Sequence, residues 1–350
     1  MILSRAPLRI TLGGGGTDLK SYYSQYGGFL IAAGVDRYCT ILVNRRFYDE
    51  IRLSYSEMEI VKSVDQIRHR IFRETLKMVG IHKNIELHST ADVPSNSGLG
   101  SSSSFTVALL NALHAYKGEY LEKRRLAEEA CHIEIDLLGE PIGKQDQYMA
   151  AFGGITCLTF EKDGNVLVEP LHLDEDVLEQ LENNLLFFFT GKERGASEIL
   201  KEQDDKSKQN DEEMVNNLHQ IKDIGLKTKE CLEKGDIDML GELLHAHWET
   251  KKKRSQKMSD PFIDECYDTA RKKGALGGKL IGAGGGGFLM FYCQNGEKYL
   301  VTEAMRKLGL RRERLKIDWD GARIMLNSKE SVFAYDVENH PKILTHKVRV

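Results

Sequence analysis

The sequence has little of what would place it in several common protein classes. Its six cysteines are widely separated and form no Cys-x-x-Cys pair, which argues against a zinc site or a disulfide framework. No window approaches about 18 uncharged apolar residues, so we expect no membrane span. The first residues lack the long apolar stretch of a signal peptide. A reducing, cytoplasmic setting fits this pattern.

A basic excess is also missing. Lys and Arg total 49 against 53 Asp and Glu, for a net charge of −4, so we predict no nucleic-acid partner. The run KKKR at 251–254 lies beside acidic stretches and is expected to be a solvated helix face. With 350 residues, the chain is long enough for a large core and two lobes.

Glycine, by contrast, is abundant and clustered, with 32 residues that mark tight turns between apolar runs. Short β-branched runs predict strands over the first 60 residues, and apolar spacing predicts helices at 65–79, 105–116 and 121–138. Most of 197–273 is expected to be helical, with strands returning after it, including one near 314–318. The pattern predicts an α+β protein with an N-terminal lobe at 1–180 and a C-terminal lobe at 181–350.

The stretch PSNSGLGSSSS at 94–104 leads into an apolar helix. A helix N-terminus carries unpaired N–H groups and a partial positive charge, and glycines let the backbone approach an anion closely. The stretch therefore favours phosphate binding, and a Ser-rich helix cap is the alternative. The residues expected to form this phosphate site are Pro94, Gly98, Leu99, Gly100, Ser101, Ser102 and Ser103.

Two other glycine-rich stretches resemble known nucleotide-binding motifs, but the residues in and around them do not fit those motifs. GEPIGKQ at 139–145 has one residue too few for a Walker A loop and ends in Gln where Ser or Thr is needed. GAGGGG at 282–287 matches the dinucleotide-binding pattern, but FLMFYC follows it as a strand where a helix is required. A dinucleotide-dependent oxidoreductase is therefore disfavoured.

Three segments in order carry a family resemblance: APLRITLGGGGTDL at 6–19, the Ser/Gly stretch, and KLIGAGGGGF at 279–288. Together they resemble the signature segments of the GHMP kinases, and the resemblance runs from about residue 3 to about residue 327. The Ser/Gly stretch is the most specific. The first segment departs from the galactokinase pattern, with Gly-Gly-Gly where Gly-Glu-His would precede Thr17 and Asp18. That form resembles the branch of heptose phosphate kinases and fucokinase-like enzymes.

The resemblance implies an N-terminal lobe like a ribosomal-protein domain, a ferredoxin-like C-terminal lobe, and the use of ATP with Mg²⁺. Ser102 and Glu134 match the positions that hold magnesium, although Glu134 on its own could be a surface helix carboxylate. Asp146 matches the catalytic aspartate, although an Asp at a helix start is commonly an N-cap. Arg9 matches the basic residue beside that aspartate, where its cation would offset transition-state charge. Lys144 is either a second cation or solvent-exposed.

The substrate site is expected to include Thr17, Asp18, Gly284 and Gly285. Asp18 would bind a sugar hydroxyl, and a turn-forming Asp is the alternative. Arg194, in TGKERGASEIL, is a candidate for gripping a phosphate already on the substrate. The resemblance implies phosphorylation of the anomeric hydroxyl of heptose 7-phosphate. A kinase of a free sugar such as fucose and a non-catalytic ligand-binding protein are the rivals. The oligomeric state stays open, with a homodimer as one arrangement.

Overall fold

The computed structural model describes residues 1–192 and 197–328. Within these ranges, eight strands form the first sheet, in the order β12-β1-β2-β5-β3-β4, with β6 pairing with β2 and β7 with β6. Its strands are β1 (Ile2–Gly13), β2 (Gly28–Arg45), β3 (Ile51–Ser54), β4 (Met58–Val61), β5 (Ile85–Ala91), β6 (Ile155–Phe160), β7 (Val166–Pro170) and β12 (Arg323–Asn327).

The strand β2 organises this sheet. It joins two predicted strands, FLIAAGV and YCTILVNR, into one of 18 residues. One side of β2 pairs with β1 along most of its length. On the other side, residues 28–33 pair with β6 and residues 39–45 pair with β5. The sheet therefore continues past the point where β5 ends, and β1 is buried beside β2 over most of its length.

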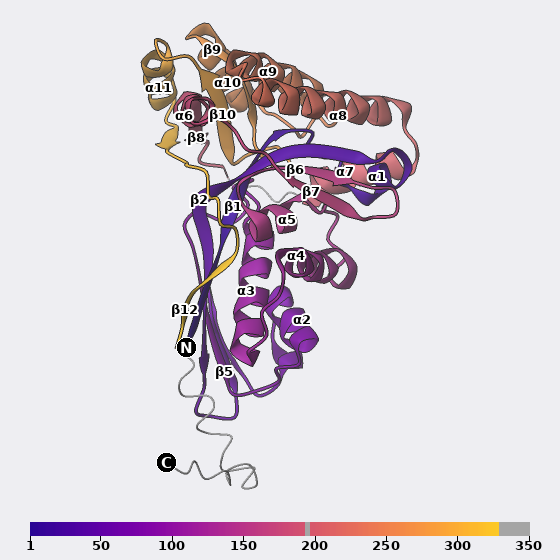
Figure 1. The fold of residues 1–350 in the computed structure, drawn as a ribbon, viewed down its shortest axis with the longest axis vertical. Coiled ribbons are helices and arrows are strands. Elements are labelled where there is room, and N and C mark those ends of the chain that lie inside the picture. The colour runs from indigo at the N-terminus through magenta and orange to yellow at the C-terminus, as the bar shows by residue number, and fades with distance from the viewer. Residues whose placement is uncertain (193–196, 329–350) are drawn as a thin grey trace, which may run out of the picture.

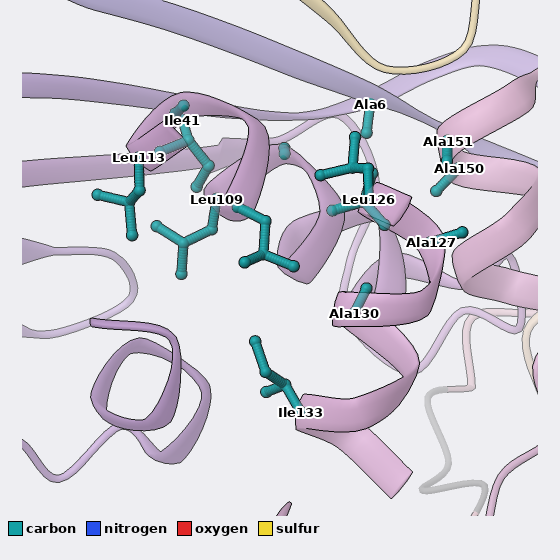
Figure 2. Packing of buried hydrophobic residues seen from close by; sticks show 14 of the residues in the cluster. Ala6, Ile41, Leu109, Leu113, Leu126, Ala127, Ala130, Ile133, Ala150 and Ala151 are labelled. Atoms are coloured by element: carbon teal, nitrogen blue, oxygen red, sulfur yellow. The ribbon is translucent and has the colours of Figure 1, made fainter. Parts of the chain in front are cut away.

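Four helices cover one face of this sheet (Figure 1). They are α2 (Arg70–Val79), α3 (Ser101–Lys117), α4 (Lys123–Cys131) and α5 (Gln145–Phe152). Figure 2 shows Leu113 of α3 beside Ile41 of β2, and Leu109 between them and Leu126 and Ala130 of α4. Because α3 is enclosed by the sheet and its helical neighbours, it is apolar around most of its circumference.

The second sheet has four strands in the described part of the chain, in the order β11-β8-β10-β9. They are β8 (Leu185–Phe189), β9 (Ala275–Leu280), β10 (Phe288–Cys293) and β11 (Arg311–Glu313). The helices of this half are α6 (Glu175–Asn184), α7 (Ser197–Lys208), α8 (Glu212–Glu233), α9 (Ile237–Lys252), α10 (Pro261–Lys272) and α11 (Lys298–Lys307). The strands β8, β9 and β10 are buried almost throughout, as the continuous apolar runs of β8 and β10 predict.

The two sheets share a hydrophobic core. Leu8, Ile10 and Leu12 of β1 belong to the same buried cluster as Phe187 of β8 and Met290 of β10. The last strand of the described residues, β12, pairs with β1 and so belongs to the first sheet. The sheets therefore do not divide the chain at a single point, and the lobe limits 1–180 and 181–350 stay a prediction. Across the described ranges, no helix has both the length and the hydrophobicity needed to cross a bilayer.

Several element boundaries differ from prediction. The predicted helix at 65–79 begins only at Arg70, because a short 3₁₀ helix η1 (Val64–Gln66), capped by Ser63, and then His69 interrupt the chain. The predicted strand near 314–318 is reduced to one bridge between Val35 and Ile317. The predicted helix at 121–138 is α4 followed by a π-helical segment η2 (His132–Leu137). Helix α1 (Lys20–Tyr26) lies where no helix was predicted.

Candidate active site

A cavity of about 460 Å³ is lined by residues from both halves of the chain. Its wall includes β1 and the turn after it, the start of α3, η2 and the start of α5. From the other half come α7, the end of α9, and the turn after β9. The predicted site residues that line it are Arg9, Asp18, Gly98, Gly100, Ser101, Ser102, Ser103, Glu134 and Asp146. Arg9 and Asp146, which are 137 positions apart in sequence, thus share one wall.

The Ser/Gly stretch ends directly at the start of a helix, as predicted. Gly100 is the N-cap of α3 in a left-handed conformation, and no side chain caps the helix. The Ser-rich cap is therefore wrong as an explanation of this stretch, and the first turn of α3 lines the cavity instead. A Cβ on Gly98 would lie 2.7 Å from the carbonyl oxygen of Ile281, so the second and third glycine segments pack against each other as expected.

Arg9 and Asp146 form a two-point ion pair in the cavity wall. Nε and Nη2 of Arg9 donate to the two carboxylate oxygens of Asp146 at 2.7 and 2.8 Å. Nη1 of Arg9 donates to the carbonyl of Gly98, which joins the pair to the Ser/Gly loop. The N-cap interpretation of Asp146 is wrong, because α5 begins at Gln145 and both oxygens bind Arg9. The Asp146 side chain keeps 22% exposure, whereas that of Arg9 keeps 5%.

Glu134 is buried within η2, so the surface-carboxylate alternative is wrong. Ser102 Oγ donates to its Oε1 at 2.7 Å, and Gln147 Nε2 donates to its Oε2 at 2.8 Å. Burial raises the pKa of Glu134 to about 7, against the hydrogen bonds that favour the carboxylate. A π-helical turn inside a helix is a frequent feature of functional sites, and here it turns a carboxylate toward the start of α3.

The Ser102–Glu134 pair has the chemistry that Mg²⁺ prefers. It offers a hydroxyl and a carboxylate, both hard oxygen donors, and magnesium usually takes few protein ligands beside phosphates and water. The hydrogen-bond partners of Glu134 in residues 1–192 and 197–328 are neutral side chains, so its negative charge is not paired with a cation there. Within those ranges, no group of three or more His, Cys, Asp or Glu side chains forms a metal cluster.

Asp18 is buried beneath the first glycine segment. Its carboxylate accepts from the backbone N–H of Gly16 at 3.1 Å and of Gln145 at 3.2 Å. Burial and the nearby charge of Asp146 raise its pKa. Asp18 therefore shapes a turn and also lines the cavity next to the ion pair. Thr17 is different, since its hydroxyl donates within the turn to the carbonyls of Gly14 and Phe29, and it is not part of the described wall.

Other predicted residues lie away from the described wall. Gly284 and Gly285 pack against Met258, and the turn after β9 reaches the cavity through Gly282 and Ala283 instead. Pro94 is exposed, and the side chain of Leu99 is in the core while its carbonyl accepts from the Arg9 N–H. The half-buried Lys144 donates to the carbonyl of Gly164 at 2.6 Å. Arg194 lies outside the described residues.

The sequence analysis missed a cationic side of the cavity. Lys251, Arg254 and Lys279 are buried and line it, together with His247. The expectation of a solvated face for 251–254 is therefore wrong for Lys251 and Arg254, although Lys253 is exposed. The signal was the helical period of α9: its buried positions continue at the same spacing into the basic run. The charge of residues 251–254 argued for solvent exposure, so the continuation of the buried positions was missed.

Comparison with known proteins decides the family. Residues 60–154 match the family described as GHMP kinases N terminal domain, and residues 228–309 match GHMP kinases C terminal. The D-glycero-alpha-D-manno-heptose 7-phosphate kinase of Campylobacter jejuni is 34% identical over 324 residues, which cover 87% of this chain and 93% of the relative. The chain belongs to the GHMP kinases.

Solved structures agree with this assignment. The crystal structure of a D-glycero-D-manno-heptose 1-phosphate kinase from Bacteroides thetaiotaomicron has a TM-score of 0.78 and 27% identity, over 93% of this GHMP kinase and 99% of that chain. The Lactococcus lactis galactokinase, solved with galactose, shares the fold at a TM-score of 0.74 and 19% identity, over 92% of this chain and 94% of that one. The predicted α+β, two-lobed fold is confirmed. The protein is an ATP-dependent phosphotransferase acting on a sugar hydroxyl.

Proposed function

We propose that this kinase transfers the γ-phosphoryl group of ATP to the anomeric hydroxyl of D-glycero-D-manno-heptose 7-phosphate, giving the 1,7-bisphosphate and ADP. The observation that carries the proposal is the Arg9–Asp146 ion pair beside the Ser/Gly loop, in one cavity with the buried Asp18. The choice of sugar is supported by the 34% identity to the heptose 7-phosphate kinase.

Asp146 acts as the base in this mechanism. Its carboxylate accepts the proton of the sugar hydroxyl as that oxygen attacks the γ-phosphorus, and the bond from phosphorus to the β,γ-bridging oxygen breaks to release ADP. Arg9 fixes the orientation of the carboxylate with two hydrogen bonds and places a positive charge near the transferred group. Asp18 accepts a hydrogen bond from a sugar hydroxyl and so orients the ring.

The nucleotide lies at the start of α3. Backbone N–H groups of the Gly98–Ser103 segment hold its phosphates, because a helix N-terminus attracts anions. Ser102 and Glu134 would hold Mg²⁺, which would offset the negative charge of the phosphates. Arg194 stays a predicted ligand of the substrate phosphate. The product would serve nucleotide-activated heptose synthesis for capsule or lipopolysaccharide. We place the enzyme in the cytoplasm, consistent with its six free cysteines.

A panel of sugars tests the proposal. Heptose 7-phosphate, the same heptose without phosphate, fucose and galactose are each incubated with MgATP, and ADP release is followed together with the position of the new phosphate by NMR. We expect efficient turnover of heptose 7-phosphate alone, with the new phosphate at C1. Efficient turnover of a free sugar, with no preference for the phosphate ester, would support the fucokinase-like alternative. No ADP release from any sugar would support a non-catalytic binding protein.

A further inference from the structure

Three buried cations gather on one side of the cavity. Lys251 and Arg254 come from the end of α9 and the turn after it, and Lys279 comes from β9; they keep 6%, 4% and 2% exposure. Within residues 1–192 and 197–328, their side chains donate to carbonyl and amide oxygens, not to carboxylates. The acceptors are the carbonyls of Leu280 and Gly282 for Lys251, of Gly15 for Arg254 and of Leu12 for Lys279, with the amides of Asn217 and Gln203 also binding Arg254.

Carbonyl oxygens satisfy hydrogen bonds but carry no net charge, and the nearby carboxylate of Asp18 is a single negative charge beside three basic side chains, so the cluster is short of negative charge. Burial and the positive charges of Arg254 and Arg9 lower the pKa of Lys251 to about 7. Burial and the charges of Lys251, Arg254 and Arg9 lower the pKa of Lys279 well below its usual range. Burying charge without a counter-charge is costly, and an anion entering from the cavity would relieve that cost.

His247 gives a second, independent sign that a ligand belongs here. It lines the same cavity at 2% exposure, and neither ring nitrogen has a hydrogen-bond partner. A buried polar group without a partner costs free energy that is recovered when a ligand supplies one. Burial and the nearby Lys279, Arg254 and Lys251 lower the pKa of His247 well below its usual range, so the neutral ring has one N–H to donate.

The position of Arg254 indicates which anion fits. Its guanidinium reaches the carbonyl of Gly15, three residues before the sugar-binding candidate Asp18. A Cβ on Gly16 would lie only 2.5 Å from Nη1 of Arg254, so the glycine leaves that space to the guanidinium. The start of α3, proposed to hold the nucleotide phosphates, belongs to the other half of the chain. Arg254 therefore borders the sugar side of the cavity, whereas Lys251 also binds the Gly282 carbonyl in the turn that packs against Gly98 of the nucleotide loop.

We infer that Lys251, Arg254, Lys279 and His247 bind the phosphate group that the sugar substrate already carries. This inference rests on the proposed function and adds to it the residues that select a phosphorylated sugar over a free one. Phosphate oxygens match the donor set, since guanidinium and ammonium groups both bind phosphate strongly when they are shielded from water. The alternative is that the cluster only ties α9 and β9 to the glycine turn after β1.

The test measures kcat/KM for heptose 7-phosphate and for the same heptose without phosphate, and takes their ratio as the phosphate preference. Arg254→Gln removes the charge, and its amide nitrogen can occupy the position from which Nε of Arg254 donates to Asn217. Lys279→Met removes the second charge at similar length. Arg254→Lys restores the charge, and Lys253→Gln removes the exposed lysine next to Arg254 as a matched control. Melting temperature and the KM for ATP are measured on each preparation.

We expect Arg254→Gln and Lys279→Met to lower the phosphate preference about tenfold to a hundredfold, through a higher KM for heptose 7-phosphate. Their KM for ATP should stay within about twofold, Arg254→Lys should recover part of the preference, and Lys253→Gln should match the parent. If Arg254→Gln and Lys279→Met both fold and both keep the phosphate preference, the inference is overturned but the proposed function is not. A selective rise in their KM for ATP would have the same consequence. A parent enzyme without any phosphate preference would overturn the proposed function as well.

Discussion

Arg9 on β1 and Asp146 on α5 are 137 positions apart in sequence, yet two hydrogen bonds of 2.7 and 2.8 Å hold their side chains face to face. The backbone N–H of Arg9 also donates to the Leu99 carbonyl, and its Nη1 binds the Gly98 carbonyl. One arginine thus fixes both the carboxylate proposed as the base and the loop proposed to hold ATP. Strand, loop and helix are positioned together by this contact.

The contact between the second and third glycine segments can be tested by adding one methyl group. In Gly282→Ala, the new Cβ would lie 2.6 Å from Cα of Gly98, and the residue has φ +76°, which L side chains rarely adopt. We expect a loss of about 1–3 kcal/mol in the free energy of unfolding and a raised KM for ATP, because the Ser/Gly loop must shift. Thermal unfolding and nucleotide titration measure both effects.

Gly296→Ala is the matched control for that change. A Cβ at Gly296 meets nothing within 4 Å, and its backbone does not need glycine. The control should therefore match the parent in both assays. An unperturbed KM for ATP in Gly282→Ala would mean that the third glycine segment does not support the nucleotide loop.

The proposed magnesium-binding role of Glu134 can be tested separately from its role in packing. Glu134→Gln keeps the shape of the side chain and its hydrogen bond to Ser102, but a neutral amide is a poor magnesium ligand. We expect the Mg²⁺ concentration for half-maximal activity to rise at least tenfold, with little change in melting temperature. Glu140→Gln, on the same cavity wall, is the control. A Mg²⁺ titration identical to that of the parent would remove Glu134 from the metal site.

The pH dependence of substrate binding follows from Lys251. Its pKa is lowered from 10.5 to about 7 in the folded, ligand-free protein, so it is charged below pH 7 and neutral above. The unfolded chain binds more protons between about pH 7 and 10.5, so Lys251 makes the protein more stable as pH rises through that window. A phosphate bound next to Lys251 favours the charged form of that lysine. Its attraction to Lys251 therefore weakens as pH rises through 7, while the pKa of Arg254, at about 10, keeps that side chain charged.

We therefore expect the KM for heptose 7-phosphate to rise between pH 7 and pH 9 in the parent enzyme. A phosphate monoester is already largely dianionic above about pH 6, so its own titration does not produce this rise. Lys251→Gln should have a higher KM at pH 7 and a flatter profile, whereas Lys253→Gln should follow the parent. Parallel profiles in Lys251→Gln and the parent would show that Lys251 does not titrate against the substrate.

The sequence predicted the parts of the site that depend on local pattern. The start of α3 at Ser101 followed from glycine and serine before an apolar run, and the place of Asp146 at a helix start followed from the Pro/Gly loop before it. The pairing of Arg9 with Asp146 could be expected only from the family resemblance, because nothing local links two residues so distant in sequence.

The cationic wall shows where pattern reasoning failed. Lys251 and Arg254 occupy positions that continue the buried side of α9, but their charge argued for solvent. Their burial depends on packing against the turn after β1 and the turn after β9, two segments more than 200 and about 30 residues away. The helical period places Lys251 and Arg254 on the same side as the buried residues of α9. Only the tertiary structure shows that this side faces a cavity.

The most direct test of the account is Asp146→Asn, measured for kcat, ATP affinity and melting temperature on one preparation. An amide cannot accept the hydroxyl proton, so we predict a loss of about 10²–10⁴ in kcat. ATP affinity should persist, because the nucleotide is held by the Ser/Gly loop, and the melting temperature should stay close to that of the parent. A folded variant that binds ATP and turns over heptose 7-phosphate within a few-fold of the parent would contradict the account.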